Sequence, residues 1–80
     1  MDTRKAVANR LVQLSGEKGL TINKLASVSA VAPSTVKNIL YGKSKNPGIV
    51  TIKFICDGLG ITLNEFFSTP EFDALEQEMK

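Results

Sequence analysis

A stripe of polar side chains recurs between residues 33 and 41 at the spacing of one helical face. Its members, three or four residues apart, are Ser34, Lys37, Asn38 and Tyr41. In a helix, residues at this spacing lie on one side. Their amide, ammonium and hydroxyl groups are of the kind that hydrogen bond to the edges of nucleic-acid bases. The stripe therefore indicates a binding surface for a nucleic acid.

Apolar residues predict the two helices that must position this stripe. Between residues 33 and 41 they are Val36, Ile39 and Leu40, on the side opposite the stripe. An earlier short helix is predicted from Thr21, a capping residue, to about Val28. A tight turn is predicted at residues 29–31, and Pro33 is a favourable first residue for the second helix. Two short helices, a three-residue turn and a cationic outer face describe a helix-turn-helix.

The sequence resembles the phage repressor and Cro-like (XRE-type) helix-turn-helix family from about Val7 to Phe67. The residues that carry the resemblance are Leu25-Ala26, Val31, Val36, Ile39, Tyr41-Gly42-Lys43, Ile52, Ile55, Leu59-Gly60-Ile61 and Leu63-Asn64-Glu65-Phe66-Phe67. A series of hydrophobic positions with turns between them is more specific than any single spacing. The resemblance implies an all-α fold, a five-helix lambda-repressor-like bundle followed by a short acidic C-terminal helix.

Four positions depart from the pattern of that family. Ala30 stands where the turn usually has glycine, so a left-handed backbone there would cost about 1 kcal/mol or slightly more. Ala32, a poor helix cap, replaces the usual Ser or Thr before the second helix of the motif. Ile22 replaces a glutamine that the family uses on phosphate, and Leu40 replaces a frequent glutamate.

Capping residues and apolar spacing predict the remaining helices. The first is expected from Asp2 or Thr3 to about Glu17, with a buried stripe of Val7, Leu11 and Leu14. Gly42 is expected to end the helix that begins at Pro33, in a left-handed conformation. Thr51 is expected to cap the fourth helix, in which Gly58 would permit close packing. Thr62 and Glu65 form a predicted capping box that opens the fifth.

The C-terminal residues form a separate, acidic segment. The predicted division places the helix-turn-helix domain in residues 1–68 and an acidic helix or tail in residues 69–80. A helix is expected to start at Thr69-Pro70 and to carry Phe72, Leu75 and Met79 on one face. That face could pack on the domain, pair with a second subunit, or fray.

The composition fits one small domain and excludes several functions. The chain has 80 residues, 42% of them hydrophobic, which is enough for a single compact core. It has no histidine and only one cysteine, Cys56, which excludes an intramolecular disulfide, His-based catalysis and structural zinc within one chain. We therefore expect a binding protein that is not an enzyme and uses no cofactor or metal. Without a signal peptide or long apolar run, a cytoplasmic location and no membrane partner are expected.

The net charge of +2 hides a strong asymmetry along the chain. The charged residues from residue 18 to residue 53 are all lysines: Lys18, Lys24, Lys37, Lys43, Lys45 and Lys53. From residue 57 the acids are Asp57, Glu65, Glu71, Asp73, Glu76 and Glu78. The basic segment coincides with the helix-turn-helix, which favours a polyanionic partner.

Position within the motif, together with the resemblance, assigns candidate contacts. Base contacts are expected from Pro33, Ser34, Thr35, Lys37 and Asn38, and phosphate contacts from Thr21, Asn23, Lys43, Lys45 and Asn46. Asn38 can pair with adenine N6 and N7, and Lys37 can donate to guanine O6 and N7. An N-terminal basic residue of the first helix could also reach a phosphate, but its place is not fixed by the sequence.

The resemblance implies sequence-specific binding to a double-stranded DNA operator and transcriptional control, most simply repression. A homodimer on two half-sites is an arrangement that this fold uses. The alternative is a protein-interaction module or an antitoxin that uses the same fold and binds a toxin or other protein through the C-terminal tail. Only DNA binding predicts that log K falls with log salt, by about 0.9 per neutralised phosphate.

Overall fold

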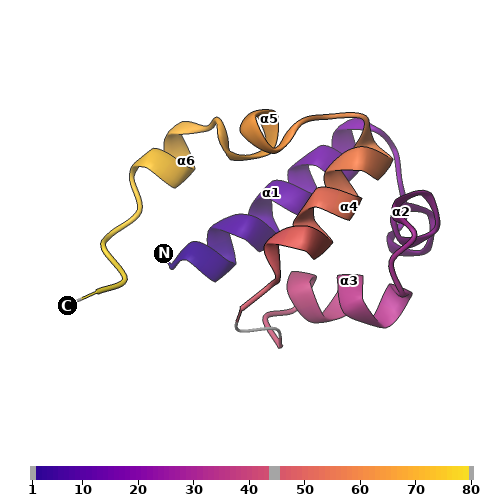
Figure 1. Cartoon of the computed structure of the whole chain (residues 1–80), viewed down its shortest axis with the longest axis horizontal. Coiled ribbons are helices and arrows are strands. Elements are labelled where there is room, and N and C mark those ends of the chain that lie inside the picture. Colours follow the sequence, from indigo (N-terminus) through magenta and orange to yellow (C-terminus); the bar gives the residue numbers. More distant parts are fainter. Residues whose placement is uncertain (1, 44–45, 80) are drawn as a thin grey trace.

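The chain folds into helices joined by short turns (Figure 1). The computed structural model describes residues 2–43 and 46–79, and no strand occurs among them. The helices are α1 (Thr3–Glu17), α2 (Ile22–Ser29), α3 (Pro33–Leu40), α4 (Ile49–Leu59), α5 (Leu63–Phe67) and α6 (Pro70–Asp73). This order confirms the predicted all-α bundle of five helices with a short further helix.

The first five helices enclose one hydrophobic core. Its most buried large side chains are Leu11, Leu25, Val36, Ile39, Ile55, Cys56 and Phe66, each less than 2% exposed. Val7 and Leu14 are buried beside Leu11, as the spacing in the first helix predicts. α2 packs chiefly on α4, and α3 packs on both α1 and α2. Burial of a Leu or Phe side chain stabilises the fold by about 1.5–3 kcal/mol, so this core holds α3 in place.

Side-chain caps define four of the helix starts, those of α1, α2, α5 and, through Thr69, α6. The Asp2 side chain accepts a hydrogen bond from the backbone N–H of Lys5 at 2.8 Å, so α1 begins where the sequence predicts. Thr21 Oγ1 caps α2 by accepting from the N–H of Lys24 at 3.1 Å. The capping box before α5 is also present, with Thr62 and Glu65 each bonding the other's backbone N–H.

The start of α4 differs from the prediction. The helix begins at Ile49 after Gly48, so Thr51 lies inside its first turn and the expected cap at Thr51 is wrong. Ile49 and Val50 are both exposed, so the inward-facing apolar pattern starts only at Ile52, one turn too late. Sequence periodicity detects the buried side of a helix and misses a first turn that faces outward.

The C-terminal segment unwinds earlier than predicted. α6 starts at Pro70, as expected, but ends at Asp73, so Phe72, Leu75 and Met79 do not form one helical stripe. Phe72 packs against the rings of Phe66 and Phe67, with centroids 6.2 and 5.0 Å away. Met79 is 84% exposed. Beyond Phe72 the chain has little core left to pack on, and a single turn of helix is not stable by itself.

Two hydrogen-bonded contacts attach later parts of the chain to α1: one from α5 and one from near the C-terminus. Arg10 donates from Nε to the carbonyl of Phe66 and from Nη2 to the carbonyl of Glu65, both at 2.7 Å. It therefore satisfies carbonyls that the short α5 leaves without helical partners. Near the C-terminus, Glu78 Oε2 accepts from Thr3 Oγ1 at 2.6 Å, at the start of α1. An acidic group there is favoured by the helix dipole.

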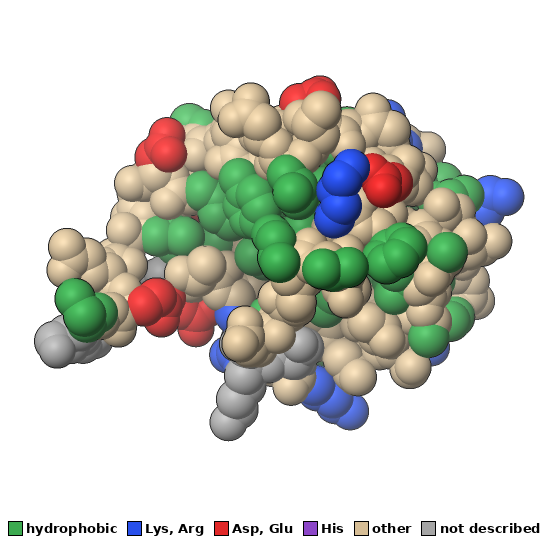
Figure 2. All heavy atoms as spheres, viewed as in Figure 1, with side chains coloured by type: hydrophobic (Ala, Val, Ile, Leu, Met, Phe, Trp, Pro, Cys, Tyr) green, Lys and Arg blue, Asp and Glu red, His purple; other side chains and the backbone are tan. Residues whose placement is uncertain are grey.

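The surface carries charged side chains of both signs and some exposed hydrophobic side chains. On the face drawn in Figure 2, Lys and Arg side chains show along the lower edge, where α3 lies, at the right-hand edge, and in the middle beside an acidic side chain. Asp and Glu side chains show at the upper edge and towards the C-terminus (Figure 2). Hydrophobic side chains gather along α4 on the same face. The basic and acidic segments of the sequence meet on α4, where Lys53 and Asp57 form a salt bridge.

Candidate nucleic-acid interface

The turn between α2 and α3 has the strained geometry that the sequence predicts. Ala30 lies in the left-handed region with φ 55° and ψ 38°, and it is the one described residue other than glycine with positive φ. The N–H of Val31 donates to the carbonyl of Ala26 at 3.1 Å, which closes the end of α2. Gly42 and Gly60 end α3 and α4 in the same conformation without the strain of a Cβ.

α3 starts immediately after this turn and has two contrasting sides. Pro33 is its first residue, and Ala32 before it makes no side-chain cap, as predicted. Val36 and Ile39 are 0% and 1% exposed and fix the inner side in the core. The opposite side remains uncovered by any other described part of the chain, and Tyr41 at its end is 69% exposed.

The five residues predicted to contact bases lie together on or near this outer side. Four of them are exposed: Pro33, Ser34, Lys37 and Asn38. Thr35 is half-buried, on the flank of the helix. The stripe that the sequence indicates is therefore a continuous polar surface, carrying an ammonium, a hydroxyl and a carboxamide group.

The residues predicted to contact phosphate lie at two places next to α3. Thr21 and Asn23 are exposed at the start of α2, where backbone N–H groups and the helix dipole favour an anion. The Thr21 hydroxyl already accepts the capping hydrogen bond, which leaves its proton available as a donor. Lys43 and Asn46 are exposed after the end of α3, whereas Lys45 lies outside the described residues.

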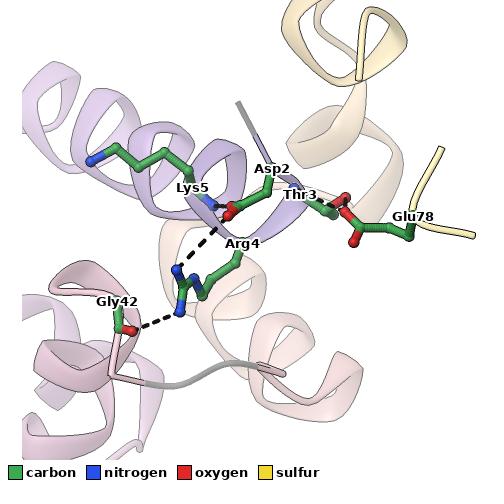
Figure 3. Close-up of polar contacts among 6 residues, drawn as sticks. All are labelled: Asp2, Thr3, Arg4, Lys5, Gly42 and Glu78. Carbon is green, nitrogen blue, oxygen red and sulfur yellow. Dashed lines mark hydrogen bonds and ion pairs between the residues drawn. The ribbon is translucent and has the colours of Figure 1, made fainter. Parts of the chain in front are cut away.

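Arg4 is a further residue of this region. The sequence indicates that a basic residue of the first helix could lie near the DNA, but it does not fix which one or where. Arg4 Nη1 donates to the carbonyl of Gly42 at 3.0 Å (Figure 3), so the start of α1 holds the end of α3. Its Nη2 lies 3.8 Å from Asp2 Oδ2. Arg4 and Lys5 line a hollow of about 400 Å³ together with Tyr41. No local pattern could reveal this contact, because the two residues are far apart in the sequence.

No alternative chemistry stands out in the part of the chain that the structure describes. Residues 2–43 and 46–79 contain no group of three or more His, Cys, Asp or Glu side chains placed to hold a metal ion. Cys56 is buried, and this burial raises the pKa of its thiol, which disfavours the reactive thiolate. None of the described helices has the length and hydropathy needed to cross a membrane.

Comparisons with known proteins agree with this geometry. Residues 10–71, more than half of the chain, match the model of the Cro/C1-type helix-turn-helix DNA-binding domain. The crystal structure of prophage Lp1 protein 11 superposes with a TM-score of 0.80 at 36% sequence identity, over 94% of this chain and 100% of that one. A comparison with curated proteins finds no match. The chain belongs to the Cro/C1-type helix-turn-helix DNA-binding family.

Proposed function

We propose that the chain is a transcriptional regulator, most simply a repressor, that binds its operator by placing the outer side of α3 in the major groove. Membership of the family supports DNA binding. The observation that carries the proposal is the contrast on α3, where Val36 and Ile39 are buried and Ser34, Lys37 and Asn38 are exposed. A helix presented in this way fits the major groove of B-form DNA.

Base readout would come from the first turns of α3. Asn38 would bond adenine N6 and N7, and Lys37 would donate to guanine O6 and N7. Ser34 and Thr35 would add hydroxyl contacts, and Pro33 an apolar contact with a thymine methyl group. Each good bidentate contact discriminates against a wrong base by about 1–3 kcal/mol.

Phosphate contacts would fix the position of α3 on the duplex. The start of α2, with Thr21 and Asn23, and the segment after α3, with Lys43, Lys45 and Asn46, would each contact one strand. Arg4 would act indirectly, through its hydrogen bond to Gly42 at the end of α3. As a regulator of this kind, the protein would act in the cytoplasm, where two copies would occupy two half-sites.

The test is selection of bound sites from a random pool of duplex DNA by the wild-type chain, followed by the same selection with Asn38→Ala. The wild type should enrich one motif, and the variant should lose preference at a single base pair within it. Asn64→Ala is the matched control, because Asn64 is an exposed amide on α5. A wild-type chain that binds no duplex at low salt would overturn the proposal.

A second function is supported by the C-terminal segment. After α6 the chain leaves helical geometry, and Met79 remains 84% exposed. An antitoxin or interaction module would use residues 69–80 to bind a toxin or other protein. Truncation after Thr69 should then abolish binding to that protein while DNA affinity is unchanged. Such binding should depend little on salt, unlike contacts to phosphate.

A further inference from the structure

The hollow at the end of α3 is lined by two basic side chains and one aromatic side chain. Arg4 and Lys5 come from the first turn of α1, and Tyr41 is the residue that follows α3. The hollow measures about 400 Å³, and the described residues that line it include no Asp or Glu. Neither Lys5 nor Tyr41 has a part in the contacts of the proposed function. We call this site the Tyr41 hollow.

The guanidinium group of Arg4 is already engaged with the protein itself. Its Nη1 donates to the carbonyl of Gly42 at 3.0 Å, and its Nη2 lies 3.8 Å from Asp2 Oδ2. Carbonyl groups at the end of a helix carry a partial negative charge, which repels an anion. Arg4 offsets this charge where α3 ends, so the hollow can accept a negatively charged group.

Lys5 and Tyr41 supply the groups that remain for an outside ligand. Lys5 is exposed, and none of the salt bridges between described residues includes it. Its backbone N–H bonds Asp2, while its side chain extends away from that carboxylate (Figure 3). Tyr41 is 69% exposed, and a phenolic hydroxyl can donate a hydrogen bond. An ammonium group and a hydroxyl donor at one hollow suit the oxygens of a phosphate.

We propose that Lys5 and Tyr41 bind one phosphate of the DNA backbone in the Tyr41 hollow. The proposal rests on the proposed function, because it requires a duplex along the outer side of α3. Tyr41 is the last member of the polar stripe that includes Ser34, Lys37 and Asn38, so the hollow continues that surface. This continuity identifies the duplex as the source of the phosphate. α1, outside the helix-turn-helix, then contributes directly to DNA affinity.

The salt dependence of operator binding tests the contact made by Lys5. Fluorescence anisotropy would measure affinity for the selected operator from about 0.05 to 0.3 M salt. Lys5→Gln should lower the affinity about fivefold near 0.1 M salt and reduce the slope of log K against log salt by about 0.9, because one phosphate is no longer neutralised. Lys53→Gln is the matched control, since it removes the same charge from an exposed side chain on α4 outside the hollow. The control should keep the wild-type slope.

Tyr41→Phe separates the hydroxyl from the aromatic ring. The variant should bind the operator about threefold more weakly, because it loses one hydrogen bond to phosphate. Its salt slope should equal that of the wild type, since no charge is removed. Lys5 and Tyr41 are both exposed, so circular dichroism should report the same helix content for the wild type and both variants.

Uncharged methylphosphonates, placed one at a time in the operator, identify the phosphate. One position should weaken binding by the wild type about fivefold and leave Lys5→Gln unaffected, because that variant already lacks the contact. Lys43→Ala should remain sensitive at this position, since Lys43 does not line the hollow. Inorganic phosphate should compete with the operator no more than chloride does at equal ionic strength.

The proposal is overturned by an unchanged salt slope in Lys5→Gln, by wild-type affinity in Tyr41→Phe, or by the absence of a Lys5-dependent position in the operator. Competition by inorganic phosphate that depends on Lys5 would also overturn it and would assign the hollow to a free ion. In each of these results the wild type still binds duplex DNA, so the proposed function stands. A wild type that binds no duplex at low salt overturns both.

Discussion

Gly58 of α4 lies so close to Ser29 of α2 that a Cβ added to Gly58 would come within 2.4 Å of Ser29 Oγ. The added atom would also lie 2.8 Å from the carbonyl oxygen of Val28 and 2.9 Å from Ser29 Cα. The close packing that the sequence predicts for Gly58 is therefore confirmed. This approach sets the separation of α2 and α4, and with it the position of the turn that leads into α3.

Gly58→Ala should lower the free energy of unfolding by about 2 kcal/mol, although alanine is the better helix former by about 1 kcal/mol. The reason is that backbone atoms of α2 must move to admit the methyl group. Urea denaturation measures this change. Gly16→Ala in α1 is the control, because a Cβ there meets nothing within 4 Å and should stabilise the protein. A neutral Gly58→Ala would contradict the close approach.

Ser29→Ala should leave stability unchanged or raise it by about 1 kcal/mol. Ser29 is 2% exposed, and its hydroxyl has no hydrogen-bond partner among the described residues. Removal of an unsatisfied buried hydroxyl recovers its desolvation penalty. The double variant with Gly58→Ala should be less destabilised than the sum of the two, since the closest contact is removed. A clear loss of stability in the single variant would show that the hydroxyl has a partner.

Ala30→Gly should stabilise the protein by about 1 kcal/mol, because glycine adopts the left-handed conformation without the penalty paid by a Cβ. The midpoint of urea denaturation should rise with an unchanged slope. Ser27→Gly, at an exposed position inside α2, is the control and should destabilise by about 0.5 kcal/mol. Equal effects of the two glycines would show that φ at Ala30 is not positive in solution.

Arg4→Gln should loosen the end of α3, because it removes the guanidinium that bonds the Gly42 carbonyl. The amide of Lys43, which donates to the Asn38 carbonyl at 2.9 Å, should exchange with solvent several-fold faster. Affinity for the selected operator should fall more than with Lys5→Gln, which removes the same charge. Equal losses of affinity in the two variants would mean that only charge matters at Arg4.

Stability should fall as pH rises above about 9, through Cys56. Burial raises the pKa of this thiol above its ordinary 9.0, so the unfolded chain loses the proton first. Unfolding then releases a proton, and the free energy of unfolding decreases with pH. Cys56→Ala should be less stable at pH 7, because it leaves a cavity, but its free energy of unfolding should lack the decrease that Cys56 causes between pH 8 and 10. Lys53, whose pKa is raised chiefly by its hydrogen bond to Asp57 and also by Cys56, titrates in both proteins.

Features defined within one helical turn could be predicted from the sequence. The caps at Asp2, Thr21 and Thr62 each bond a backbone N–H three positions away. The left-handed backbone at Ala30 follows from its place in the short turn between two helices, each of which shows in the sequence as a pattern of apolar residues. The exposed stripe on α3 follows in the same way from residue spacing. The contacts assigned to individual bases and phosphates, and the boundary after residue 68, stay predictions.

Other features depend on how distant helices lie against one another. Arg4 reaches Gly42 and Arg10 reaches Phe66 because α1 crosses the ends of α3 and α5, and Gly58 meets Ser29 because α2 and α4 pack closely. The exposed first turn of α4 and the unwound segment after Asp73 also depend on where the core ends. The sequence by itself determined the helices and the polar side of α3, since those depend on nearby residues. Only the tertiary structure decided which helix ends meet. Those contacts join segments that are far apart in the sequence, so their free energy depends on how the helices pack and leaves no local sequence pattern.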